Sequence, residues 1–196
     1  MLVAMAVAAT VVFFFIYPFF AITQRVESRL LVVEGWVDAH AIKVAAEEFR
    51  GGGLDRVFST GGPVEGLGGY INDYSTAASV GAGRLRQAGV PADKVQMVPS
   101  RVSARDRTYS SAVALRKWCG ENKVPLTAVN VLTEDVHARR TRLLFQMALG
   151  PDVKVGIIAV SNVDYDAARW WCYSEGVRAV IGETIAYVYV RFLFFP

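Results

Sequence analysis

The fold is decided by residues 128–150, which read AVNVLTEDVHARRTRLLFQMALG. The first residues of this stretch are mostly apolar and β-branched, which predicts a buried strand. A short polar turn follows, and apolar residues then recur at helical spacing as far as Gly150, a typical helix end. The stretch therefore predicts a strand, a turn and a helix, the repeating unit of an α/β domain.

The helix of this stretch can be phased by its apolar side chains. At about 100° per residue, His137 and Arg140 fall on the face of Leu144, which must point into a core. His137 and Arg140 therefore lie beyond the carboxyl end of the strand, where open α/β sheets bind ligands and a helix start favours an anion. The alternative is a solvated basic helix start with His137 hydrogen-bonded locally. We expect solvation for the outward-facing Arg139 and Arg142.

Strand-like and helix-like segments alternate along the rest of the chain. Regular alternation with nearly continuous apolar strands predicts a parallel sheet that is covered on both faces. We therefore expect a Rossmann-like, three-layer α/β domain with a mostly parallel sheet of about five strands. Strands are predicted at residues 30–33, 56–59, 94–98, 127–132 and 153–160, and helices at 39–50, 72–88, 108–122, 137–150, 164–171 and 174–192.

An uncharged apolar segment precedes this domain. Residues 2–22 carry no charge, and a helix of that length spans about 30 Å, the thickness of a bilayer core. We expect one transmembrane helix at residues 1–23 and the α/β domain at residues 24–196. A cleaved signal peptide is the alternative, but the run is long and no basic residue precedes it. Arg25 and Arg29 follow it, which favours a cytoplasmic domain by the positive-inside tendency.

The other end of the chain is also apolar. Residues 186–195 predict either a docked terminal helix or strand, or a segment that contacts the bilayer beside the anchor, because aromatic side chains suit the membrane interface. Cys119 and Cys172 show no metal-ligand spacing and are either small buried residues or one disulfide. The net charge of +3 and the lack of a basic tract exclude nucleic acid as an expected partner.

Unusual polar residues gather in the loops that follow the predicted strands. In a parallel sheet these loops open on one edge, whereas the opposite loops here carry ordinary helix stops such as residues 51–53. A shared site at this edge is therefore the main hypothesis. We expect His137 and Glu34 to be catalytic, and we expect the ligand to be bound by Gly35, Gly61, Gly62, Arg105, Arg107, Thr108, Thr133 and Arg140.

Each of these residues also has a structural explanation. The glycine pair at 61–62 makes a tight turn or lets a ligand approach the backbone, and it lacks the spacing of the phosphate-loop fingerprints. Glu34 caps the next helix, or it serves as a base or as a hydrogen-bond acceptor for the ligand. Thr108 is better explained as a helix cap than as a ligand contact. Arg107 is solvated, or it forms an anion clamp with Arg140.

These motifs, in this order, resemble the DUF218 family of bacterial envelope-associated proteins, the ElyC/SanA/YdcF group. The resemblance covers residues 30–160 and depends most on TEDVHARR at 133–140. It also depends on VVEG at 32–35, TGG at 60–62, GVP at 89–91 and RTYSSA at 107–112. The chain departs from the family pattern at 108–112, where Thr-x-Glu-Asn-Ala is usual, and it lacks a glutamate near 74–76.

The resemblance implies a Rossmann-like domain held at the bacterial inner membrane by a single-pass anchor. It implies that the domain faces the periplasm, against the signal from the flanking arginines. It also implies a link to cell-envelope or peptidoglycan-precursor metabolism, without a settled reaction. Partners are then the membrane, a small anionic or lipid-linked ligand and an envelope enzyme.

The site hypothesis is a membrane-anchored hydrolase or transferase that acts on a phosphorylated or otherwise anionic envelope precursor. Arg140, with Arg105 or Arg107, would bind the anion. His137 would be the general acid or base and Glu34 the second proton-transfer group. No tightly bound metal is expected, because one histidine with scattered carboxylates is a poor ligand set, although Mg²⁺ can arrive with a phosphate substrate. The alternatives are a non-catalytic module that binds an anion or nucleotide, and an anchored partner of an envelope enzyme.

Overall fold

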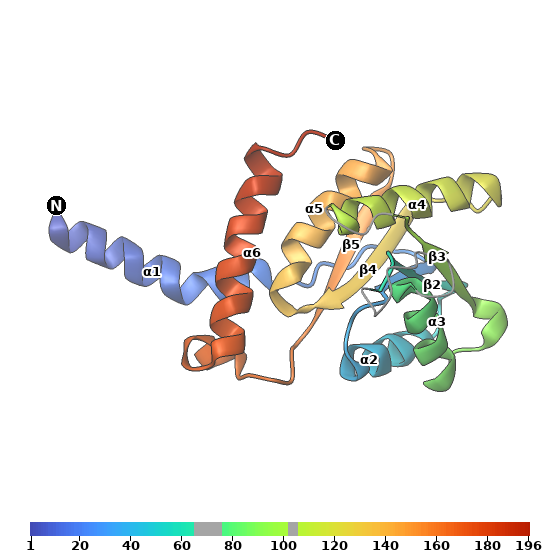
Figure 1. Ribbon diagram of the computed structural model, residues 1–196, viewed down its shortest axis with the longest axis horizontal. Coiled ribbons are helices and arrows are strands. Elements are labelled where there is room, and N and C mark those ends of the chain that lie inside the picture. The colour runs from blue at the N-terminus through green and yellow to red at the C-terminus, as the bar shows by residue number, and fades with distance from the viewer. Residues whose placement is uncertain (65–75, 102–105) are drawn as a thin grey trace.

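A parallel sheet forms the centre of the protein (Figure 1), in a computed structural model that describes residues 1–64, 76–101 and 106–196. Its strands are β1 (Leu30–Glu34), β2 (Arg56–Gly61), β3 (Val95–Pro99), β4 (Ala128–Glu134) and β5 (Lys154–Val160). The strand order is β3-β2-β1-β4-β5, and each neighbouring pair is parallel. The predicted α/β domain with a parallel sheet of five strands is therefore confirmed, and the order is consistent with a Rossmann-like class.

Helices cover both faces of this sheet. They are α2 (Ala39–Arg50), α3 (Ala77–Gln87), α4 (Arg107–Glu121) and α5 (Ala138–Leu149). A further helix, α6 (Ser174–Phe192), packs against α5. Two short 3-10 segments, η1 (Ala92–Lys94) and η2 (Asp135–His137), precede β3 and α5. Figure 1 shows α2 and α3 on one face and α4 and α5 on the other, so the expected three layers are present.

One predicted helix is wrong in type. Residues 164–171 do not form an α-helix; instead a 3-10 segment, η3 (Ala167–Cys172), lies there and Arg169 has non-helical backbone angles. The Asp166 side chain accepts a hydrogen bond from the Ala168 N–H, which stabilises a tight local turn in place of a helical start. The predicted helix at 72–88 begins outside the described residues, and its described part is α3.

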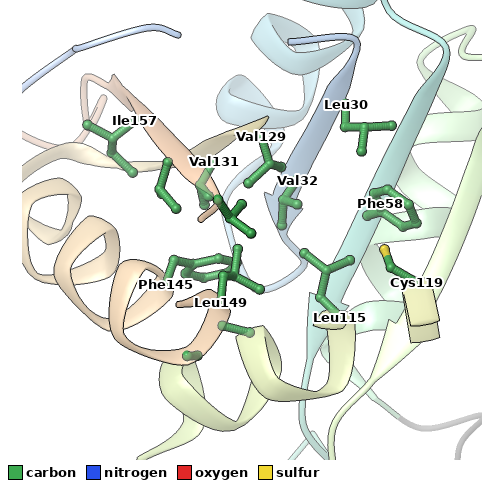
Figure 2. Packing of buried hydrophobic residues seen from close by; sticks show 14 of the residues in the cluster. Leu30, Val32, Phe58, Leu115, Cys119, Val129, Val131, Phe145, Leu149 and Ile157 are labelled. Atoms are coloured by element: carbon green, nitrogen blue, oxygen red, sulfur yellow. The ribbon is translucent and has the colours of Figure 1, made fainter. Parts of the chain in front are cut away.

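Alternation along β1 produces two cores, one on each face of the sheet. Leu30 and Val32 pack with the residues under α4 and α5, whereas Leu31 and Val33 pack with those under α2 and α3. Figure 2 shows the first core, where Phe145 of α5 meets side chains from the sheet. Full burial of such a side chain contributes about 1.5–3 kcal/mol, so the continuous apolar strands account for the double cover.

The strand order places a crevice between β1 and β4. The chain leaves β1 towards α2 on one face and leaves β4 towards α5 on the other, because the order reverses between these two strands. Loops diverge at such a switch point, and ligands of open α/β sheets bind there, at the carboxyl ends of the strands. The loops after β1 and β4 are those that the sequence predicts to carry Glu34 and His137.

The N-terminal apolar segment forms a separate helix, α1 (Leu2–Phe20), which extends away from the sheet in Figure 1. Its last turns touch the domain, where Phe20 is buried and the Tyr17 hydroxyl donates a hydrogen bond to Asp135. Within the described part of the chain, none of the helices combines the length and the apolar character needed to cross a bilayer. The transmembrane helix expected at residues 1–23 is therefore not supported.

The apolar C-terminal region is the docked helix α6. Val180 and Val190 are buried on its inner side, whereas other large apolar side chains of α6, such as Ile185 and Phe192, are exposed. Figure 1 places α6 beside α5, so the helix adds to the layer that carries His137. The alternative of a disulfide is wrong for this structure, because Cys119 is a buried free thiol and Cys172 an exposed one.

Candidate functional site

A pocket of about 710 Å³ lies at the carboxyl edge of the sheet. Its walls come from the loops after β1 and β2, from the starts of α3, α4 and α5, and from the last turns of α6. The predicted site residues that line it are Glu34, Gly35, Gly61, Gly62, Arg107, Thr108, His137 and Arg140. The expectation that separate loops deliver these side chains to a common rim is therefore confirmed. Thr133 does not line the pocket, because it is fully buried and donates its hydroxyl to Glu34, and Arg105 lies outside the described residues.

Glu34, the last residue of β1, forms the polar floor of this pocket and is 3% exposed. Its carboxylate accepts hydrogen bonds from the hydroxyls of Thr133 and Thr141 at one oxygen and of Thr108 at the other. Thr108 therefore binds Glu34 instead of capping α4 through its side chain. Hydrogen bonds to a buried carboxylate compensate for lost hydration, so the threonines allow an acidic side chain to remain at this depth.

The alternation of β1 explains where the Glu34 side chain points. Glu34 shares its face of the strand with Leu30 and Val32, which pack under α4 and α5. Val33 of β1 pairs with Leu132 of β4, and Glu34 and Thr133 are the next residues of these two strands. The Thr133 hydroxyl therefore lies beside the Glu34 carboxylate. The position of the carboxylate therefore follows from strand register.

His137 faces the pocket as its phase predicts, and it has two partners there. Its Nδ1 lies 2.6 Å from Oε1 of Glu183 in α6, and its ring packs edge-on against Trp36 at a centroid distance of 5.0 Å. Burial lowers the pKa of His137, but the hydrogen bond and charge of Glu183 more than offset this, and the pKa lies above its ordinary value. The imidazole is therefore biased towards its charged form.

Arg140 is also bound by Glu183. Its Nε donates to Oε2 at 2.7 Å and its Nη2 donates to Oε1 at 2.6 Å, which makes a bidentate pair. Burial acts to raise the pKa of Glu183, but the hydrogen bonds from His137 and Arg140 hold the pKa at about 2. The carboxylate of Glu183 thus supplies a negative charge for the basic start of α5.

Sequence reasoning missed Glu183 and Thr141. Glu183 lies in α6, far from His137 in the sequence. A single glutamate in an apolar helix carries no local signal of its partner. Its isolation among apolar residues was the available sign, because a buried acid needs a cationic partner. Thr141 follows His137 by one helical turn, so the phasing that placed His137 on the inner face also applied to it.

Two outward-facing arginines were predicted wrongly as solvated. Arg139 donates through Nε to the carbonyl oxygen of Phe19 and lies over that residue's ring at 3.9 Å. Arg142 donates through Nε to the carbonyl oxygen of Val155 at 3.0 Å. Both side chains therefore fasten other segments to α5, one of them the end of α1.

The glycines of the site are explained by helix packing. A Cβ on Gly35 would lie 2.0 Å from the carbonyl oxygen of Ala77, the first residue of α3. Gly61 has a φ of 152°, and a Cβ there would lie 2.6 Å from that of Ala77. Both glycines let α3 approach the sheet closely, which is a structural reason for Gly61 that the sequence analysis did not include. Backbone contact with a ligand at Gly35, Gly61 or Gly62 stays a prediction.

Further polar groups complete the wall. Arg107 begins α4 and lines the pocket, and Arg84 lines it while donating to the carbonyl oxygen of Val37 at 3.0 Å. The Thr60 hydroxyl is buried beside the pocket without a hydrogen-bond partner among the described residues. An unpartnered buried hydroxyl at a pocket wall suits a ligand that supplies the missing hydrogen bond. The described residues contain no group of three metal-ligating side chains.

We found no family model, no curated protein and no solved structure that matches the chain. The resemblance to the DUF218 family is therefore untested by comparison and stays a prediction. The pocket at the β1–β4 switch point brings together a buried carboxylate, a histidine and three arginines, which are Arg84, Arg107 and Arg140.

Proposed function

We propose that this pocket binds a small phosphorylated or otherwise anionic molecule and that the protein hydrolyses it or transfers its anionic group. The observation that carries the proposal is that Glu34, His137 and Arg140 lie in one pocket at the β1–β4 switch point. A volume of about 710 Å³ suits a ligand of nucleotide or sugar-phosphate size. Arg107 and Arg140 supply positive charge for the anion.

The two proton-transfer groups have distinct roles in this proposal. Glu34 is a carboxylate whose hydrogen bonds come from neutral hydroxyls, so it can accept a proton from an attacking water. His137, whose pKa is raised by Glu183, can donate a proton to the leaving oxygen. For a phosphate monoester, water then adds to phosphorus, the ester bond breaks, and the products are an alcohol and inorganic phosphate.

The substrate class that we propose is a cell-envelope precursor, peptidoglycan-derived or lipid-linked, as the DUF218 resemblance implies. The test is phosphate release from a panel of such intermediates by the full chain. We expect turnover of at least one, and loss of turnover in His137→Ala. Unchanged turnover in His137→Ala would remove His137 from the mechanism, and no turnover across the panel would contradict the enzyme.

A second candidate is a module that binds an anionic ligand or nucleotide without turnover. The ion pairs of His137 and Arg140 with Glu183 support it, because they hold both side chains in place without requiring a reaction. Thermal-shift titration with phosphate and nucleotides separates the two, since a saturable shift without product formation indicates binding. A scaffold for an envelope enzyme would instead keep its partner in Arg140→Ala and respond to no ligand.

The proposed location is the bacterial inner membrane, with the domain on the periplasmic side. Exposed apolar side chains gather on α1 and α6 and support contact with lipid: Val3, Met5, Val12, Phe14, Phe15, Ile185, Val188, Phe192 and Leu193. Cell fractionation tests the location. Cys172 is exposed and Cys119 buried, so a membrane-impermeant maleimide should label Cys172 in cells with a permeable outer membrane and an intact inner one. Labelling only after lysis would contradict a periplasmic domain.

A further inference from the structure

The carboxylate of Glu183 lies behind both cationic side chains of the pocket. We infer that Glu183 is a positioning residue, which orients His137 and Arg140 as one two-donor seat for a single oxyanion group of the ligand. The inference rests on the proposed function, because it says how that site holds its anion. Glu183 itself is not a catalytic residue in this scheme.

One carboxylate oxygen of Glu183 contacts both cationic side chains. Oε1 of Glu183 lies 2.6 Å from Nδ1 of His137 and 2.6 Å from Nη2 of Arg140. The two nitrogens are 3.3 Å apart, but both must donate to the carboxylate, so neither donates to the other. Glu183 is 4% exposed and held at three points, which allows its carboxylate little freedom to turn.

The contact with Glu183 determines which ring nitrogen of His137 carries the proton. A carboxylate at Nδ1 requires a proton on that nitrogen, so neutral His137 exposes the lone pair of Nε2. Protonated His137 instead presents an Nε2–H. The edge-on contact with Trp36 restricts rotation of the ring. Among the described residues, Nε2 of His137 and Nη1 of Arg140 have no protein hydrogen-bond partner, and both residues line the pocket.

His137, Arg140 and Glu183 together carry a net positive charge when His137 is protonated. The single negative charge of Glu183 offsets one of the two cations, so the net charge of the three side chains is +1. The other acidic groups that act on the imidazole are Glu34 in β1 and the residues at the β4 end, Glu134 and Asp135. A phosphate, sulfate or carboxylate oxygen pair fits two outward donors, and inorganic phosphate is the simplest probe.

The experiment is histidine NMR on the full chain labelled with ¹⁵N at its two histidines. A His40→Asn sample assigns the signal of His137. We expect the neutral form of His137 to carry its proton on Nδ1, and its pKa to lie above 6.5. Glu183→Gln should lower that pKa by at least about 1 unit, since it removes the opposite charge. Inorganic phosphate should shift the Nε2 signal, and its affinity should fall about tenfold in Glu183→Gln.

The matched control is Glu175→Gln on the same helix, an exposed acid paired with Arg178, which should change none of these readings. A proton on Nε2 in the neutral wild type, or a His137 pKa that Glu183→Gln does not change, would overturn the positioning role. If Glu183→Gln does not fold, Glu183→Gln/Arg140→Met removes the unpaired cation and the His137 pKa is read there.

Failure of the proposed function has a different signature. A pocket with the expected His137 tautomer but no phosphate-dependent shift would overturn the anion seat. A phosphate shift without turnover of any envelope precursor would support the seat and contradict the enzyme.

Discussion

Glu183 of α6 forms a bidentate ion pair with Arg140 of α5, at N–O distances of 2.7 and 2.6 Å. The pair joins the C-terminal helix to the start of α5, 43 residues earlier in the chain. The Glu183 side chain is buried and that of Arg140 is 19% exposed, so removal of one member leaves the charge of the other uncompensated in a poorly hydrated place.

Single replacements of this pair should therefore be costly. We expect Glu183→Leu or Arg140→Met to lower the free energy of unfolding by about 3–5 kcal/mol, and the double variant to lose much less than the sum. Urea denaturation of the four proteins measures the coupling. The exposed pair of Glu175 and Arg178 is the control, and Glu175→Leu should leave the denaturation midpoint unchanged. Additive losses at Glu183 and Arg140 would show that the pair is not coupled.

The contact of His137 with Glu183 predicts a pH window. The pKa of Glu183 is lowered to about 2 from 4.5, so its contribution is present above 4.5 and is lost as the pH falls towards 2. The pKa of His137 is raised from 6.5, so its contribution is full below 6.5 and is lost as the pH rises through the raised value. The stability difference between wild type and His137→Gln should thus be largest between pH 4.5 and 6.5.

Urea denaturation across this pH range measures the difference. His40 is exposed, and His40→Gln provides the baseline for loss of a histidine without a buried partner. A difference that grows steadily above pH 7 would contradict the ion pair, because a neutral imidazole keeps only a hydrogen bond to Glu183 and loses the attraction between opposite charges.

The hydroxyls around Glu34 should stabilise its buried carboxylate. Thr141→Val removes a donor at 3.2 Å with little change of shape, and we expect a loss of about 1–3 kcal/mol in the free energy of unfolding. The exposed Thr127→Val is the control and should change stability by less than about 0.5 kcal/mol. Equal effects of the two variants would show that Glu34 does not need the hydroxyl of Thr141.

Glu34 itself should be needed for turnover more than for folding. Glu34→Gln keeps the shape and an acceptor oxygen but cannot take a proton, so phosphate release should fall by at least about 100-fold. Phosphate affinity should change much less, because the anion is expected at Arg107 and Arg140. Glu121→Gln, at the exposed far end of α4, is the control. Full activity in Glu34→Gln would assign the base to another group.

Two glycines of α3 should respond oppositely to alanine. A Cβ on Gly81 would lie 2.4 Å from Oγ of Ser59 and 2.6 Å from Cα of Gly35, so Gly81→Ala should cost about 1–3 kcal/mol. A Cβ on Gly83 meets nothing within 4 Å, so Gly83→Ala should add about 0.5–1 kcal/mol through helix propensity. Thermal denaturation compares them. A tolerated Gly81→Ala would show that α3 can move away from the sheet.

Several features of the site follow from local patterns and were predictable. The apolar run before Thr133 and the helical spacing after it placed His137 and Arg140 on the inner face, and both line the pocket. Glu34 ends an apolar strand, so its place at the carboxyl edge followed from the strand itself. These predictions were accurate because strand and helix periodicity depend on near neighbours in sequence.

Other features were beyond local patterns. The expectation that Arg140 is an open anion clamp did not include Glu183, and the expectation that Arg139 is solvated did not include the end of α1. In both cases the partner comes from a distant helix whose docking depends on the whole surface that it covers. The transmembrane prediction for residues 1–23 depended on composition alone and is not supported by any described helix.

The sequence by itself thus determined the elements of this protein: five buried strands, the helices between them, and the inward phase of His137. Tertiary structure alone decided the strand order, the closeness of α3 to Gly35, and the pairing of both cationic side chains with Glu183. The physical reason is the separation in sequence of the interacting residues. Periodicity is set within a few residues, whereas a buried ion pair forms only after separate helices have packed and excluded water between them.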